Sequence, residues 1–325
     1  MCLGAAFGLD PLELRFGFDA FGRGGDAEAR AEPSRGADNG ARAAGVRQIL
    51  DGTFLCRDRR MPSSGWPCCR HGSRTRSDMQ WTDEGIIIGT RRHGETSLIV
   101  ELMTRAHGRH LGLVRGGRSR KQQPNLQPGN TVLATWRARL DEHLGNYTIE
   151  PMVQRAARLI EGPAGLYGMQ IVAALLRLLP ERDPHSALFD GLGPMLDWIG
   201  DPRVGGALVV RFEMKMLEEL GFGLDIAECA VTGTAADLIY VSPKSGRAVS
   251  RAAGEAYRDR LLPLPAFLSD GGTSPNPAEI ADAFRLTGYF LARRAFEPRE
   301  MQLPEARARF LALLARSQAN VEALE

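Results

Sequence analysis

Basic side chains gather in one stretch of the sequence, from Arg91 to Lys121. This stretch holds eight Lys and Arg residues but only two carboxylates. Guanidinium forks match the geometry of phosphate oxygens, and Gly116 and Gly117 let another backbone come close. The stretch therefore indicates an anionic partner. The eight cations are Arg91, Arg92, Arg105, Arg109, Arg115, Arg118, Arg120 and Lys121.

Nine residues are candidate contacts to such a partner. Trp136 stands beside Arg137, so it could offer a flat surface on which a nucleic-acid base stacks. The alternatives are that the basic loop is only a solvated surface and that Trp136 belongs to the core. For phosphate contact we expect Arg109, Arg115, Arg118, Arg120 and Lys121, with Arg91, Arg92, Arg137 and Trp136 as outer contacts.

Familiar catalytic and metal-binding motifs are missing from the sequence. It contains no P-loop, no G-x-S-x-G, no H-E-x-x-H and no D-F-G. His107 and His110 lie three residues apart near a turn, but they lack a carboxylate or cysteine at a ligand spacing, so we expect solvated histidines. No clustered acid, base or nucleophile stands out elsewhere. The pattern therefore argues against an enzyme, including one with a dispersed site in the helical region.

Composition and cysteine usage limit the class of protein further. The 41 Lys and Arg against 39 Asp and Glu give a net charge of +2, and 43% of the residues are hydrophobic, as in ordinary globular proteins. The apolar stretch from Met169 to Leu179 is far shorter than the ~20 residues that cross a bilayer. Four of the five cysteines lie in the first 78 residues, which indicates a reducing compartment rather than a disulfide framework.

Residues 1–78 differ from the rest of the chain. They contain many glycines, arginines and alanines and show neither a helical nor a strand period, so we expect a disordered extension. Asp10 and Glu13 interrupt the only apolar start, which excludes a secretory signal. Because Met79 opens the first patterned segment, we hypothesise that the natural start is Met79.

The basic stretch must be positioned by short strands. Five strand-like runs separated by Gly-rich breaks follow Trp81, and five strands in about 75 residues are typical of an oligonucleotide-binding (OB) barrel. In such a barrel, apolar residues of the basic stretch face the core and the arginines line the open face. The runs are Glu84 to Thr90, Ser97 to Thr104, Arg109 to Gly116, Thr131 to Leu140 and Asn146 to Val153.

The period becomes helical after Pro163. Helices are predicted wherever apolar residues recur every three or four positions between Gly and Pro breaks. Residues 225–265 are instead loop- and strand-like. The predicted helices are Ala164 to Leu179, Ala187 to Ile199, Val204 to Leu220, Pro277 to about Phe296 and Pro304 to about Ala315.

Several runs, in this order and spacing, resemble the RecO family of bacterial recombination mediators. The resemblance covers Met79 to roughly Leu314 and leaves residues 1–78 outside. The runs that resemble the family's OB domain are Glu95-Thr96-Ser97-Leu98, Gly108-Arg109, Val114 to Ser119 and Leu126-Gln127-Pro128, and those that resemble its later part are Arg211-Phe212-Glu213, Leu217 to Gly223 and Cys229 to Gly233.

The resemblance implies an α+β multidomain fold. We expect an extension over 1–78, a five-stranded OB-fold barrel over 79–155, and an α-helical domain over 156–325 with a small zinc-finger-like insertion at 225–265. It also implies a non-enzymatic DNA-repair and recombination protein, cytoplasmic and associated with the nucleoid. Such a protein binds single- and double-stranded DNA, anneals strands coated with single-strand-binding protein (SSB), and helps RecR load RecA. The alternative is an RNA-binding or ribosome-associated OB protein.

The inserted segment departs from the family pattern. Many members carry two C-x-x-C pairs there, but here the first pair reads Cys229-x-x-Thr232 and the second falls at Ser250 and Ala253. One thiolate of four cannot hold a tetrahedral zinc ion, so we expect no metal and a buried, apolar role for Cys229. The small core expected in its place consists of Val231, Ile239, Tyr240, Val241 and Val249.

The acidic, aromatic-ended tail of SSB needs a basic contact beside an apolar wall. In the helical domain, Arg211 and Lys215 lie one turn apart and could supply it. The alternative is that these cations form surface salt bridges with Glu218 and Glu219.

Overall fold

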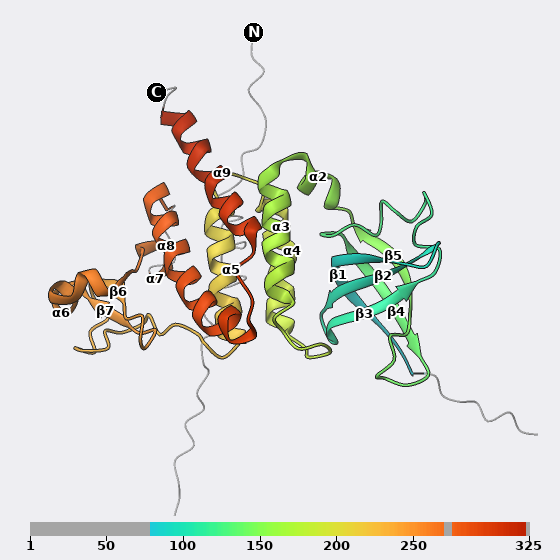
Figure 1. Cartoon of the computed structure of the whole chain (residues 1–325), viewed down its shortest axis with the longest axis horizontal. Helices are drawn as coiled ribbons and strands as arrows, with labels where there is room; N and C mark the ends of the chain where they lie inside the picture. Colours follow the sequence, from blue (N-terminus) through green and yellow to red (C-terminus); the bar gives the residue numbers. More distant parts are fainter. Residues whose placement is uncertain (1–78, 270–274, 323–325) are drawn as a thin grey trace, which may run out of the picture. The chain divides into compact units, whose positions relative to one another are not determined.

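Residues 79–269 and 275–322 are described by the computed structural model of the chain. They belong to one compact unit (Figure 1). The predictions for residues 1–78, including the extension and the natural start, lie outside the described residues. Among the described helices, none is long and apolar enough to cross a membrane.

The N-terminal region is a closed five-stranded barrel, as an OB fold requires. Its strand order is β1-β2-β3-β5-β4, and β4 pairs with β1 to close it. All of these pairs are antiparallel except β3 with β5, which meet in parallel at Leu113 and Asn146. The strands are β1 (Met79–His93), β2 (Ser97–Thr104), β3 (Gly108–Val114), β4 (Thr131–Ala138) and β5 (Asn146–Val153).

The isoleucine run in β1 serves two cores at once. Ile87 packs inside the barrel with Val100 and Leu102, whereas Ile86 and Ile88 belong to the core of the helical region. Successive side chains of a strand point to opposite faces, so a strand covered on both faces reads as a continuous apolar run. The barrel and the helices are therefore joined by apolar packing through β1.

The rest of the chain is mainly helical. Five of its helices correspond to the predicted ones, although α9 continues to Glu322, beyond the predicted end near Ala315. The helices α2 and α7 were not expected, because six and four residues are too few to show a helical period. The last part of the helix expected from Pro277 winds as a π-helix, η2. The helices are α2 (Ala156–Glu161), α3 (Pro163–Leu176), α4 (Ser186–Trp198), α5 (Gly205–Glu219), α7 (Ala266–Ser269), α8 (Pro277–Phe290), η2 (Leu291–Phe296), η3 (Glu297–Arg299) and α9 (Glu305–Glu322).

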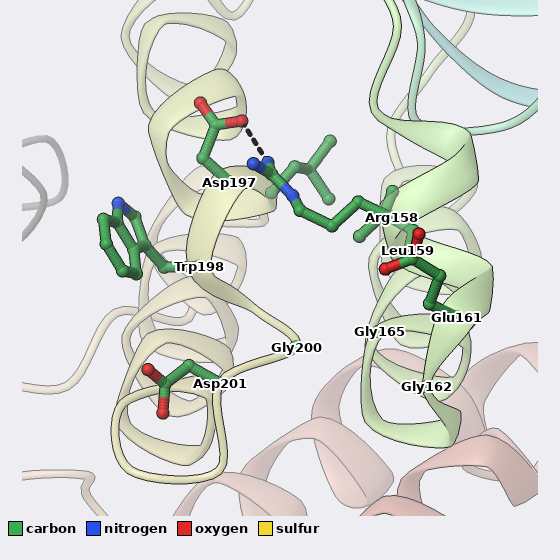
Figure 2. A pocket seen from close by; sticks show the side chains of 10 residues that line it. Arg158, Leu159, Glu161, Gly162, Gly165, Asp197, Trp198, Gly200 and Asp201 are labelled. Atoms are coloured by element: carbon green, nitrogen blue, oxygen red, sulfur yellow. Dashed lines mark hydrogen bonds and ion pairs between the residues drawn. The ribbon is translucent and has the colours of Figure 1, made fainter. Parts of the chain in front are cut away.

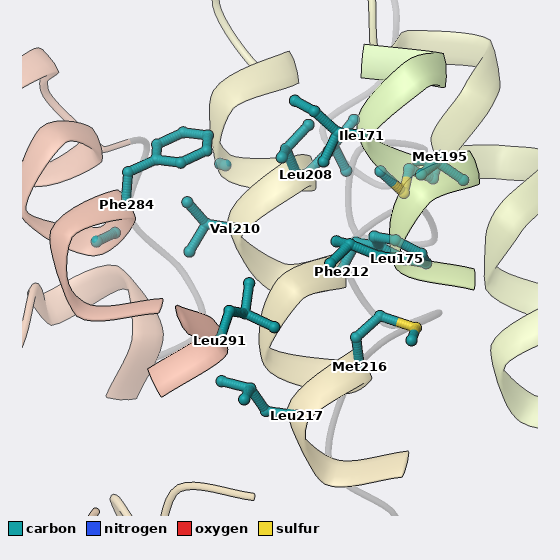
Figure 3. Close-up of a cluster of buried hydrophobic side chains, with 14 of the residues drawn as sticks. Ile171, Leu175, Met195, Leu208, Val210, Phe212, Met216, Leu217, Phe284 and Leu291 are labelled. Atoms are coloured by element: carbon teal, nitrogen blue, oxygen red, sulfur yellow. The ribbon is translucent and has the colours of Figure 1, made fainter. Parts of the chain in front are cut away.

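The helical core is built around α5. In Figure 3, Leu175 of α3 and Met195 of α4 lie on the side of α5 that carries Phe212, which is fully buried. Phe284 of α8 lies on the other side of α5 and faces Val210. One charged pair lies inside this core: Arg307 of α9 binds Glu213 of α5 through two hydrogen bonds of 2.7 and 3.0 Å. Thr287 of α8 donates to the same carboxylate. The pair links the C-terminal helix to the centre of the domain.

The inserted segment folds as a small three-stranded sheet in the order β7-β6-β8. Cys229 is buried, and its Sγ accepts a hydrogen bond of 3.3 Å from the backbone N–H of Ser250. The expected core is confirmed for Val241 and Val249 but wrong for Val231, which is exposed because it lies on a turn before the sheet. The elements are β6 (Leu238–Val241), β7 (Ala248–Ser250), α6 (Arg251–Gly254), η1 (Glu255–Arg260) and β8 (Leu262–Pro263).

Candidate nucleic-acid interface

Six cations gather at one end of the barrel, which we call the basic end. The β1–β2 hairpin closes there at His93 and Ser97, and Leu98 of β2 pairs with Val114, the last residue of β3. The loop after β3 folds back onto this hairpin, because the N–H of Arg118 binds the carbonyl of Thr96 at 3.0 Å. The basic end comprises Arg91, Arg92, Arg115, Arg118, Arg120 and Lys121.

The basic end is open to a ligand. Five of its six side chains belong to exposed residues, and within the described part of the chain none of the six forms an ion pair. Arg118 is half-buried and donates to the carbonyls of Gly94 and Glu95, so it braces the hairpin. In the two segments that form the basic end, residues 91–97 and 115–121, Glu95 is the only carboxylate. The net positive charge at this end is therefore not neutralised within the described chain.

Arg109 is not part of this surface, contrary to the expectation. Its side chain is 13% exposed and binds Glu101 at 2.8 Å and Glu181 at 3.4 Å. It also donates to the carbonyl of Leu179. Since the guanidinium is occupied and buried, Arg109 fastens β3 to the segment after α3 and is not available to phosphate.

Trp136 is also unavailable, and its expected stacking role is wrong. The residue is fully buried in the barrel core, and its Nε1–H donates to the carbonyl of Leu144 at 3.0 Å. Its neighbour Arg137 points the other way and is exposed, as alternation along a strand requires. Arg137 of β4 pairs with Asn146 of β5, and Asn146 in turn pairs with Leu113 of β3. Arg137 therefore lies two strands away from β3, whose end is followed by Arg115.

The sequence predicts two solvated histidines, but in the structure both rings are engaged. His110 is 2% exposed, with Nδ1 3.0 Å from the hydroxyl of Tyr147, and burial lowers its pKa to about 4. His107 stacks on Trp81 with ring centroids 4.0 Å apart and planes 9° apart. Trp81 in turn stacks on Trp136 at 5.7 Å and 19°. We call Trp136, Trp81 and His107 the aromatic stack.

Sequence reasoning missed the aromatic stack because it depends on strand register. Trp81 lies opposite Trp136 only through the pairing of β1 with β4, 55 positions later. A local signal was nevertheless present: Trp81 and Asp83 alternate along β1, so both lie on one face of the strand. His107 joins them because its ring nitrogen lies 3.0 Å from Asp83.

The two cations predicted to hold a partner peptide lie on α5 and are engaged within the helical region. Lys215 binds Glu218 at 3.1 Å and Glu219 at 3.3 Å, so the salt-bridge alternative describes Lys215. Arg211 donates to the carbonyl of Phe267 at 2.9 Å, and its guanidinium lies 5.9 Å from the centre of that ring. Arg211 is half-buried, and the aromatic ring that it contacts is that of Phe267, so its role as a peptide contact stays a prediction.

Two surface cavities flank α2 and are separate from the basic end. The larger, of about 830 Å³, lies between α2–α3 and the end of α4; Figure 2 shows Arg158 reaching across it to Asp197. The second, of about 480 Å³, lies between β1 and α3 and is mainly apolar. Within the described residues no group of three or more His, Cys, Asp or Glu side chains could hold a metal ion.

Comparison with known proteins matches both regions. The family model described as "Recombination protein O N terminal" matches residues 79–154, and "Recombination protein O C terminal" matches residues 162–302. The chain belongs to the RecO family. A "DNA repair protein RecO" from Mesorhizobium japonicum is 60% identical over 247 residues, covering 76% of this chain and 98% of that protein. Proteins of the same name from Chelativorans and Brucella abortus are each 58% identical over 240 residues, covering 74% of this chain and 97% of theirs.

Membership in the RecO family confirms the resemblance seen in the sequence. It also confirms the order of an OB barrel followed by a helical region, and it assigns the chain to DNA repair and recombination. In the described part of this RecO-family chain, the six cations of the basic end form no ion pair, whereas Arg105 and Arg109, which face the helices, are paired. The geometry therefore makes the basic end the candidate nucleic-acid interface.

Proposed function

We propose that this chain is a non-enzymatic mediator of DNA repair that binds single- and double-stranded DNA and anneals complementary strands coated with SSB. We propose further that it acts with RecR to load RecA, in the cytoplasm and at the nucleoid. The division into a barrel over 79–155 and a helical domain over 156–325, with an insertion at 225–265, belongs to this proposal. So does the metal-free state of the insertion.

The observation that carries the proposal is the uncompensated charge of the basic end. Arg91, Arg92, Arg115, Arg120 and Lys121 are exposed and lack ion-pair partners within the described residues. Phosphate contacts by such side chains release condensed counterions and read no sequence. A mediator needs this kind of binding, because it must act on strands of any sequence.

The arrangement also supports annealing. It requires no covalent chemistry, only that two polyanions approach while their bases stay accessible. The cations screen the repulsion between strands. The barrel presents them on a hairpin and a loop rather than in a closed channel, so the bases of the held strand stay open to a complement.

Two partner contacts complete the proposal. Arg211, against Phe267 on the helical region, is our candidate contact for the acidic, aromatic-ended tail of SSB, with Lys215 one turn away. Lys215 is already bound to Glu218 and Glu219, so a peptide carboxylate that reaches it competes with these partners. The alternative, an RNA-binding OB protein, would use the same cations, and competition between RNA and DNA distinguishes the two.

The experiment measures affinity for a single strand over a series of salt concentrations. Five phosphate contacts give a slope of log affinity against log salt of about −3.5, since each contributes about −0.7 on single strands. Replacing Arg120 and Lys121 by Ala removes two contacts and reduces the slope by about 1.4. The matched control replaces Arg258 and Arg260, which are exposed on η1 of the insertion, by Ala.

The variants also decide whether annealing depends on the same residues. We expect the Arg120 and Lys121 variant to anneal SSB-coated strands more slowly, and the control variant to behave as the unaltered chain. A salt slope that is equal in both variants would show that the basic end does not hold the phosphates. Tighter binding of RNA than of DNA of the same sequence would favour the alternative function.

A further inference from the structure

The aromatic stack ends in a ring that is open on one side. Trp136 is fully buried at its inner end, Trp81 is half-buried in the middle, and the side chain of His107 is 33% exposed at the outer end. The three planes are nearly parallel, with angles of 19° and 9° between neighbours. Within the described residues, no second ring covers the outer face of His107.

The outer ring is held in place by a carboxylate. Asp83 is 12% exposed; its Oδ2 lies 3.0 Å from Nδ1 of His107 and accepts a hydrogen bond of 2.7 Å from the N–H of Ala106. Its other oxygen accepts from the N–H of Glu84 at 2.9 Å. With Nδ1–H donated to this carboxylate, the ring is fixed in orientation.

The inner part of the stack is supported from the side. His110 is buried and meets Trp81 and Trp136 edge-on, each at 5.0 Å between centroids. Gly112 makes room for this arrangement, because a Cβ there would lie 2.3 Å from the ring of Tyr147. Because the rings of this stack are already fixed, a further flat ring that stacks on it orders few additional side chains of the protein, and the entropic cost of binding is small.

We propose that an unpaired nucleobase of a bound single strand stacks on the outer face of His107. The inference rests on the proposed function, because it needs a strand held at the basic end. Base–aromatic stacking is the means by which OB barrels hold single strands without reading sequence. A duplex keeps its bases paired, so this contact is specific to single strands.

The distance between the two places fits one strand on one barrel. The basic end lies at Ser97, the start of β2, and His107 follows its far end, where Thr104 accepts a hydrogen bond from the N–H of His107. The eight residues of β2 span about 25 Å, at ~3.3 Å each. One OB barrel covers roughly 4–16 nucleotides, so the strand that makes both contacts is one whose site lies at the longer end of this range. Such a strand passes beside β2 rather than over it, because Glu101 binds Arg177 and Met103 packs in the helical core.

The test compares an oligothymidine strand, an abasic strand of equal length and a duplex. Stacking contributes ~1–3 kcal/mol per base, so we expect H107A to lose about 5- to 150-fold in affinity for oligothymidine. Its affinities for the abasic strand and the duplex should stay unchanged. H107W should restore binding, because an indole offers a larger face. The matched control is H143A, which removes an exposed histidine outside the stack.

Two further measurements keep the outcome decisive. Thermal unfolding of H107A checks that the barrel of this variant stays folded. If the variant is unfolded, the stacking is measured on the unaltered chain instead, by the quenching of 2-aminopurine fluorescence in a bound strand. Equal losses on oligothymidine and abasic strands, no loss in H107A, or no quenching would each overturn the inference while leaving the proposed function standing. An unaltered chain that binds no strand overturns both.

Discussion

Replacing Arg109 and Arg115 separately by alanine separates structural cations from DNA-binding ones. Arg109 lies on β3 and Arg115 lies six positions later, in the loop that follows. Both are arginines of the same basic stretch, so the sequence alone does not distinguish them. In the structure, Arg109 is 13% exposed and bound to Glu101 and Glu181, whereas Arg115 is exposed and has no ion-pair partner among the described residues. We therefore expect the first substitution to lower the stability of the fold and the second to lower the affinity for DNA.

For Arg109→Ala the loss appears in stability. Removing one partner of a buried ion pair costs about 3–5 kcal/mol, because the other charge stays buried. Glu101 is 13% exposed but keeps Arg177, whose Nε lies 2.9 Å away, so we expect a smaller loss of about 2–3 kcal/mol in the free energy of unfolding. The slope of log affinity against log salt should not change.

For Arg115→Ala the loss appears in binding. A surface substitution of this kind changes the free energy of unfolding by less than about 0.5 kcal/mol. The salt slope on a single strand should fall by about 0.7, the contribution of one phosphate contact. Urea unfolding and fluorescence anisotropy at several salt concentrations measure both quantities on each variant. If Arg109→Ala lowered the salt slope while leaving stability intact, our account of the two arginines would be refuted.

Two further predictions concern buried ionisable groups. Burial lowers the pKa of His110 to about 4, so between pH 6.5 and 4 the unfolded chain binds the proton more readily than the folded chain. The free energy of unfolding therefore falls by up to about 3 kcal/mol as the pH is lowered through this window. Urea unfolding at pH 7 and pH 5 should show this fall, and His110→Gln should reduce it. Arg307→Ala leaves the fully buried Glu213 with Thr287 alone and should cost about 3–5 kcal/mol in unfolding free energy, whereas replacing both Arg307 and Glu213 by Met should cost less; a double variant as unstable as the single one would contradict this.

Much of the fold could be predicted from residue patterns. Apolar residues recur at every second position in the first region and at every third or fourth after Pro163, and these periods reflect which side chains must leave water. Most strands and longer helices accordingly lie close to their predicted limits, but β1 and α9 are longer than predicted, since β1 spans Met79–His93 and α9 continues to Glu322. Two local predictions failed for local reasons: α2 is too short to show a period, and Val231 lies on an exposed turn rather than in a strand.

The candidate site was only partly predictable. The sequence indicated where cations are dense, and the β1–β2 hairpin with the loop after β3 brings six of them to one end. It could not show that Arg109 meets Glu181, 72 positions later, or that Trp136 lies inside the barrel. Nor could it show that the exposed end of the stack is His107 rather than a tryptophan.

The sequence by itself determined the order of barrel and helices and the supply of basic side chains, because both depend on short-range periodicity and composition. Only the tertiary structure decided which cations are free and which ring is open. Both outcomes depend on partners far apart in the chain: the carboxylates that neutralise Arg109, and the strand β4 that brings Trp136 beneath Trp81. A charge or a ring is available to a ligand only when folding leaves it without such a partner.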